Sequence, residues 1–143
     1  MIKKITKTAD IPTTLIRLVV GLIFLSEGLQ KFITPDATGA GRFARIGFNN
    51  PVFWANIVGG FEIACGILIL LGLLTRLAAV PLLIIMIVAF VSTKIPTLIE
   101  EGFWSFTHSY RTDFAMTMLL IYLLMYGGGR MSIDRRLSNH SLR

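Results

Sequence analysis

Long apolar runs constrain the fold more than any other feature of this 143-residue chain. A helix needs about 20 apolar residues to cross the hydrocarbon core of a bilayer. Runs of roughly that kind predict spans at about 13–33, 53–74, 77–95 and 112–126. The fourth is short, so it must begin upstream and carry Asp113, and Arg111 with it, toward the membrane. We therefore predict an all-α fold: an integral membrane, antiparallel four-helix bundle that forms a single domain over 1–143.

The composition favours the same class. The chain is 54% hydrophobic and only 15% charged, whereas a soluble domain typically carries about 25% charged residues. The net charge of +6 is explained by basic residues that flank membrane spans. No basic patch interleaves with aromatic residues that would stack bases, so we exclude nucleic acid as a partner. The basic start MIKKITKTAD precedes a long run without a small-residue cleavage site, which predicts a retained anchor.

The distribution of Lys and Arg predicts the orientation. With four spans, both termini lie on one side of the membrane, and nine of the 14 basic residues fall on that side. They are Lys3, Lys4, Lys7, Arg17, Arg76, Arg130, Arg135, Arg136 and Arg143; the other side has Lys31, Arg42, Arg45, Lys94 and Arg111. Because basic residues favour the cytoplasmic side, we predict cytoplasmic termini and a multi-pass protein of the cell (inner or plasma) membrane.

One carboxylate interrupts the second apolar run. Glu62 lies near the middle of NIVGGFEIACGILILLGLLTR, where a charge costs on the order of 3 kcal/mol and usually marks a functional site. Gly59, Cys65 and Gly66 share its face at helical spacing, and small residues mark close helix contacts in membranes. Glu62 is therefore predicted to face the bundle, either as a proton-carrying group or as a purely structural hydrogen-bonding one.

The first span has a matching polar and small-residue stripe. It is formed by Arg17, Gly21, Phe24, Gly28 and Lys31, with Glu27 beside it. The rise per residue places Glu27, Lys31, Glu62, Arg111 and Asp113 in the outer half of the bundle, where we expect opposite charges to pair. Simpler roles remain open: a local Glu27–Lys31 pair, and Arg111 and Asp113 as anchors for the end of the fourth span. Lys31 and Arg111 are the candidate partners of Glu62, and side-chain reach favours Arg111.

The remaining reactive residues are few. Cys65 is the single cysteine, which excludes dithiol chemistry within the chain; it is either a small buried hydrophobe or a reactive thiol. His108 belongs to an aromatic outer segment, 96–111, that serves as an interfacial belt or as a lid over the site. His140 lies on the opposite side, so the two cannot ligate one haem, and Glu-x-x-His pairs of the di-iron type are missing. We predict no metal site.

Two connecting segments carry structural signals. The stretch TPDATGAGRFARIGFNNP reads as a Gly- and Pro-punctuated loop with a short helix around Phe43. The tail YGGGRMSIDRRL places glycines just past the last apolar turn, as a helix terminus requires. We predict a structured cap in which Ser132 or Asp134 accepts backbone N–H bonds. Arg130, Arg135 and Arg136 would face anionic headgroups.

Four segments together resemble the DoxX family of small membrane proteins. They are RLVVGLIFLSEGLQKF, GFNNP, GGFEIACGILILLGLLTRLAA and GGGRMSIDRR, from about Leu15 to Arg136. The matching residues are Gly21, Phe24, Gly28, Lys31, Glu62, Gly72, Arg76, Gly127, Gly129, Ser132 and Asp134. Glu27 departs from the pattern, because relatives often have a small residue or histidine there. The resemblance implies a four-helix membrane bundle. It also implies association with redox homeostasis and quinone-linked sulfur oxidation, as in the DoxD-type subunit of thiosulfate:quinone oxidoreductase.

These observations support two hypotheses of function. In the first, the protein is a redox-associated subunit of the quinone-linked oxidoreductase type, which binds a quinone or similar amphipathic molecule in the outer half of the bundle. Its catalytic candidates are Glu62 as proton carrier, with Glu27 or Asp113 as the connection to the outer face. Its substrate-binding candidates are Lys31, Arg111, Cys65 and His108; Lys31 and Arg111 would hold a semiquinone oxygen or a sulfur oxyanion. In the second, the protein is a non-catalytic scaffold, chaperone or assembly factor that contacts a partner protein or a second copy. Transport of a small solute is a third, less favoured role.

Overall fold

The computed structural model describes residues 10–141, and within this range it is entirely helical. The helices are α2 (Asp10–Ile33), α3 (Ala40–Ile46), α4 (Pro51–Leu71), α5 (Thr75–Ala89), the π-helix η1 (Phe90–Lys94), α6 (Ile95–Glu101), α7 (Phe103–Tyr126) and α8 (Ile133–Ser141). The all-α prediction is confirmed, and the short helix expected around Phe43 is α3. The basic N-terminal stretch with Lys3, Lys4 and Lys7, and Arg143, lie outside the described residues.

Three helical segments are long and apolar enough to cross a membrane: Ile11–Ile33, Pro51–Leu71 and Thr75–Glu101. They coincide with the first three predicted spans, and the third is longer than predicted because η1 and α6 continue α5 to Glu101. α7 has 24 residues, but Arg111 and Asp113 lie in its first half and reduce its apolar character. The fourth span, the four-helix bundle and the cytoplasmic termini therefore stay predictions.

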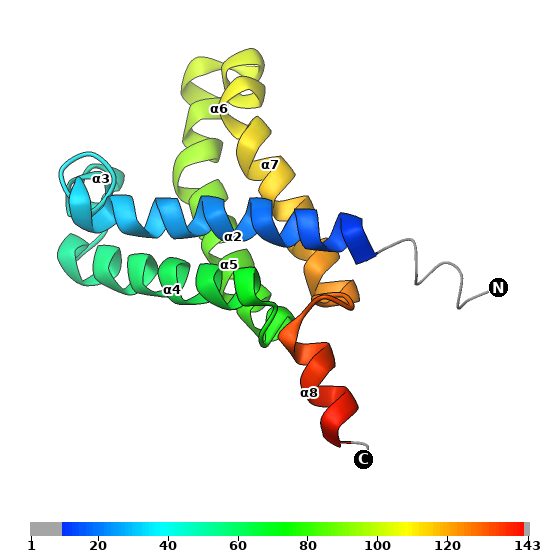
Figure 1. Ribbon diagram of the computed structural model, residues 1–143. Helices are drawn as coiled ribbons and strands as arrows, with labels where there is room; N and C mark the ends of the chain where they lie inside the picture. The colour runs from blue at the N-terminus through cyan, green and yellow to red at the C-terminus, as the bar shows by residue number, and fades with distance from the viewer. Residues whose placement is uncertain (1–9, 142–143) are drawn as a thin grey trace.

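The long helices associate as two pairs, α2 with α4 and α5 with α7. In Figure 1 the members of each pair run in opposite directions, and the α5/α7 pair passes across the α2/α4 pair. The pairs meet near the start of α2, whereas α3 and α6 lie apart from each other at the far ends. Residues at the far end of one pair are thus separated from those of the other.

Glycines bring α2 and α4 together. A Cβ atom added at Gly28 would lie 2.8 Å from the carbonyl oxygen of Gly59, and one added at Gly21 would lie 3.0 Å from that of Gly66. Both distances are shorter than an ordinary van der Waals contact. The two predicted small-residue stripes therefore pack backbone against backbone, as small residues allow in membrane helices.

The α2/α4 contact provides a direct test of this packing. We expect Gly28→Leu to lower the thermal midpoint of the detergent-solubilised protein strongly, because the new side chain meets the α4 backbone. Gly60→Ala is the matched control: it lies in α4, nothing stands within 4 Å of its Cβ position, and alanine has the higher helix propensity. Equal midpoints for the two variants in a melt followed by circular dichroism would contradict the packing.

Arg17 satisfies backbone carbonyls at the end of α4. It is 4% exposed, and its guanidinium donates to the carbonyl oxygens of Ile69 at 3.0 Å, Leu70 at 2.8 Å and Gly128 at 3.1 Å. The last carbonyls of a helix have no partner within the helix, and the buried guanidinium provides donors for two of them in α4. Arg17 thus joins α2, the end of α4 and the glycine segment after α7.

Asp134 satisfies the amides at the start of α5. Its two carboxylate oxygens accept from Leu74 N at 2.6 Å and Thr75 N at 3.0 Å, and its own amide donates to the carbonyl of Gly72 at 3.0 Å. Leu74 has a φ of 49°, and Gly72 one of 70°, so the turn requires two left-handed residues. The tail therefore closes the α4–α5 turn, and the predicted structured cap with Asp134 as acceptor is confirmed.

Removal of this cap is expected to destabilise the protein. Asp134→Ala deletes both acceptors of the α5 amides, and the loss of such a cap costs about 1–2 kcal/mol. Truncation after Tyr126 removes the Gly128 contact as well and should disturb folding or topology. Asp36→Ala, at an exposed position in the loop between α2 and α3, serves as the control. Truncated protein with wild-type stability and topology would show that the cap is dispensable.

Candidate functional site

A buried ion pair links α2 and α4. Lys31 Nζ lies 2.7 Å from Glu62 Oε2, and the two side chains are 8% and 6% exposed. Lys31 belongs to the last turn of α2 and Glu62 to the middle of α4. The close backbone contact at Gly28 and Gly59 lies one turn from each residue, which places the lysine over the carboxylate.

Other charged groups surround this pair. Lys31 Nζ is also 3.4 Å from the carbonyl oxygen of Glu27, and the charges that act on Glu62 are those of Lys31, Glu27 and Arg42. Among residues 10–141, Oε2 of Glu62 has no hydrogen-bond donor besides the Lys31 ammonium. We name Lys31 and Glu62, together with Glu27 and Arg42, whose charges act on Glu62, the outer α2/α4 cluster, after the side of the membrane predicted for it.

The preference for Arg111 as the partner of Glu62 is wrong. Lys31 occupies that position, and Arg111 is exposed on α7, which belongs to the other helix pair. Side-chain reach favoured arginine only under the assumption that all four helices face one centre. Arg42 also belongs to the cluster, and the sequence analysis does not select it. The short helix expected around Phe43 contains Arg42, so it was the available sign that a basic residue lies near this end of α2 and α4.

Asp113 lies in a second, separate ion pair. Its Oδ2 is 3.1 Å from Lys94 Nζ, which also donates to the carbonyl oxygen of Ser109 at 2.8 Å. This pair joins η1 to α7, and His108 is exposed beside it on α7. The five residues expected to gather in one outer cluster are therefore distributed: Glu27, Lys31 and Glu62 lie together, Asp113 pairs elsewhere, and Arg111 stays at the surface.

Cys65 lies one turn beyond Glu62 but faces apolar neighbours. It is 5% exposed and belongs to the core cluster with Val20, Phe24 and Ile69. This placement matches the small-hydrophobe interpretation of the thiol. Within the described range, no group of three or more His, Cys, Asp or Glu side chains is arranged to hold a metal ion.

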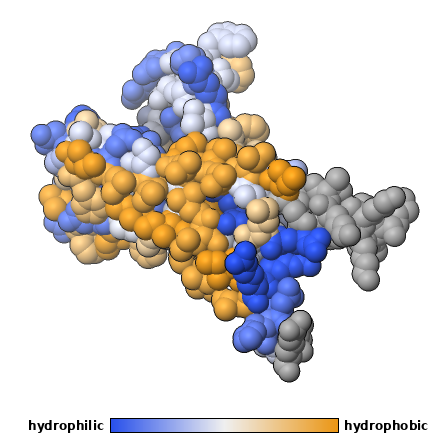
Figure 2. All heavy atoms as spheres, in the orientation of Figure 1, coloured by the Kyte–Doolittle hydropathy of each residue, from blue (hydrophilic) through white to orange (hydrophobic). Residues whose placement is uncertain are grey.

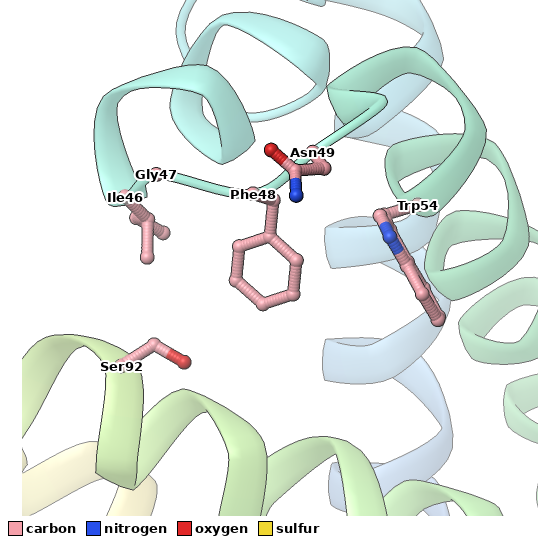
Figure 3. Close-up of a pocket in the computed structure, with 6 residues that line it drawn as sticks. All are labelled: Ile46, Gly47, Phe48, Asn49, Trp54 and Ser92. Carbon is pink, nitrogen blue, oxygen red and sulfur yellow. The ribbon is translucent and has the colours of Figure 1, made fainter.

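An open cleft separates the far ends of the two helix pairs. It has a volume of about 590 Å³ and is lined by Ile46, Gly47, Phe48, Asn49, Trp54 and Ser92. Figure 3 shows Phe48 projecting from the α3–α4 connection toward the helix that carries Ser92, with Trp54 at the side of the cleft. Phe48 and Trp54 also contact each other, with ring centroids 6.2 Å apart. Sequence reasoning did not identify this cleft, because its walls come from two different helix pairs.

The Lys31–Glu62 pair predicts a characteristic pattern of stability. Lys31→Met and Glu62→Leu each leave one charge buried without its partner, and such loss typically costs about 3–5 kcal/mol. The double variant removes both charges, so it should be more stable than either single variant. Lys94→Met, at the more exposed second pair, is the control and should cost less. Additive losses in the double variant, measured by thermal unfolding, would contradict the pairing.

Apolar spans with a buried ion pair between them define an integral membrane protein. The sequence model of the DoxX family matches residues 13–95, and the chain belongs to the DoxX family. It is 55% identical over 132 residues to "Uncharacterized membrane protein Rv3486" of Mycobacterium tuberculosis, and the aligned part covers 88% of this chain and 81% of the relative. It is 28% identical over 128 residues to "Putative oxidoreductase CatD" of Bacillus subtilis, and the aligned part covers 90% of this chain and 88% of the relative. No solved structure matches the chain.

Proposed function

We propose that this protein is a redox-associated membrane subunit that binds a quinone or a similar amphipathic molecule and moves a proton through Glu62. The observation that carries the proposal is the buried Lys31–Glu62 pair, since ionisable groups inside membrane spans are costly and usually functional. The oxidoreductase description of the Bacillus subtilis relative agrees with this class. Quinone chemistry requires a proton donor and acceptor beside an apolar surface.

The outer α2/α4 cluster supplies the proposed roles. Glu62 takes up the proton that a quinol hydroxyl releases on oxidation, or gives one to a quinone oxygen on reduction. Lys31 stabilises the carboxylate and is free to hold an anionic oxygen when Glu62 is protonated. Glu27 links the pair to the outer face. Asp113, Arg111 and His108 have no part in this mechanism, because none of them belongs to the cluster.

The cleft is the proposed place for the ring of the ligand. Phe48 and Trp54 offer flat apolar surfaces, and Asn49 and Ser92 offer polar groups at its edge. Trp54 precedes Glu62 by two turns of α4, roughly 12 Å along the helix axis. None of the four cluster residues lines the cleft, so the proposal requires a proton path of about this length between the ring and Glu62.

The proposed setting is the cell membrane, with four spans, cytoplasmic termini and the cluster in the outer half. α7 is the proposed fourth span, and a partner that supplies or accepts electrons completes the reaction. The competing function is that of a non-catalytic scaffold or assembly factor. It is favoured by the closed packing of Gly28 and Gly59 beside the pair, since a sealed ion pair also serves to set helix register.

Substitution of Glu62 separates the two functions. Glu62→Gln keeps the shape and hydrogen-bonding groups but removes the titratable proton, whereas Glu62→Leu removes the polar group as well. A proton-carrying role predicts that both variants lose activity in a redox or complementation assay while the Gln protein still folds, although with lower stability because Lys31 lacks its counter-charge. Glu100→Gln, at an exposed site on α6, is the control and should be silent. If Glu62→Gln behaves as wild type, the scaffold function is favoured.

The lipid extract of the purified protein gives a second test. A bound quinone predicts a stoichiometric amount in the extract and its absorbance in the protein spectrum. We expect Trp54→Ala to lower the quinone content, since stacking on an aromatic ring contributes to holding a flat ligand. Phe103→Ala, an exposed aromatic of α7 outside the cleft, should leave it unchanged. A quinone-free protein that co-purifies with another protein would contradict the redox proposal.

A further inference from the structure

A second pocket lies where the chain turns from α4 into α5, at the opposite end of the helix pairs from α3 and α6. It has a volume of about 610 Å³, and its walls are the start of α5, the glycine segment after α7, and α8. Figure 2 shows the hydrophilic surface of α8 directly beside the hydrophobic surface of the spans. The pocket thus opens where an apolar belt gives way to a polar tail, which is the level of lipid phosphates in a bilayer.

Two arginines with exposed side chains line this pocket. They are Arg76 at the start of α5 and Arg135 in α8. The Arg76 side chain extends over the glycine segment, since its Nε lies 3.3 Å from the Cβ position of Gly127. The carboxylate of Asp134 also borders the pocket, but both of its oxygens already accept amides of the α4–α5 turn. The pocket therefore has an excess of positive charge.

A buried hydroxyl in the wall has no partner. Thr75 is 0% exposed, and its Oγ1 has no hydrogen bond to any described group, although the residue lines the pocket. An unsatisfied buried hydroxyl is destabilising, so an external acceptor for its proton would be favourable. Gly127 and Gly129, at φ of 73° and 77°, keep the adjoining wall free of side chains.

We propose that this pocket binds a phosphate-bearing anion. The guanidinium groups of Arg76 and Arg135 bind phosphate oxygens through paired N–H donors, the geometry for which arginine is suited. The Thr75 hydroxyl donates the additional hydrogen bond that the protein itself does not use. The position beside the apolar belt admits the headgroup of an anionic phospholipid, and a soluble phosphate offers the same oxygens.

The test is lipid and phosphate binding to the purified, detergent-solubilised protein, measured by native mass spectrometry. Phosphatidylglycerol, phosphatidylcholine and inorganic phosphate are titrated separately. The variant Arg76→Gln with Arg135→Gln should weaken binding of phosphatidylglycerol about tenfold or more, since two charge-assisted contacts are lost. Arg136→Gln is the matched control: it removes an equal charge from α8 but does not line the pocket, so binding should stay as in wild type.

Each outcome decides the proposal. Phosphatidylglycerol binding that depends on Arg76 and Arg135 supports a lipid ligand. Inorganic phosphate binding with the same dependence, without lipid binding, supports a soluble ligand in the same site. Equal loss in Arg136→Gln, equal binding of phosphatidylcholine, or no binding at all overturns the site. If the double variant fails to fold, Thr75→Val carries the test, because it keeps the shape; unchanged binding in that variant overturns the proposal.

Discussion

The structure depends on how side chains from elsewhere in the chain form hydrogen bonds with the backbone of one tight turn. The turn between α4 and α5 presents carbonyls from one helix and amides from the next, and each set is met by a charged side chain from a distant part of the chain. Arg17 supplies the donors from α2, and Asp134 supplies the acceptors from the tail. These two residues therefore hold the first span, the central hairpin and the C-terminal segment in one arrangement.

The buried pair of the outer cluster follows from close backbone packing. Lys31 reaches Glu62 because glycines on both helices let α2 and α4 approach. Bulkier side chains at this interface would hold the two helices apart. Glu62 would then lack Lys31 as a partner and would avoid a buried charge by binding a proton. The same glycines that set the helix distance thus set the chemistry available to Glu62. The pair Lys94–Asp113 lies between η1 and α7, where contacts are less close, and its acid is 31% exposed.

Helical spacing was sufficient to predict the first three spans, the glycine stripes and the inward direction of Glu62, because all of these are local properties of one helix. The tail cap was also predictable, since glycines that end a helix, followed by the hydrogen-bonding residues Ser132 and Asp134, indicate a turn from the local sequence alone. The choice of Lys31 over Arg111 was not, because it depends on which helices pair. The position of a residue along its helix gives its depth in the membrane, but residues at one depth can lie on different sides of the molecule. For the same reason the sequence predicts Asp113 near Glu62 and does not predict the position of Arg42 or the cleft.

The π-helix η1 makes the third span tolerant of one change in its length. Its wider turn accommodates one residue more than an α-helical turn would, so the segment beyond it keeps the orientation that it would have after a regular helix. Deletion of a single residue between Phe90 and Thr93 would therefore leave a regular helix in which Lys94 still faces Asp113. The same deletion within the regular part of α5 would rotate the following segment by roughly 100° and turn Lys94 away from Asp113. Homologues should accordingly differ in length by one residue at η1 and not within α5.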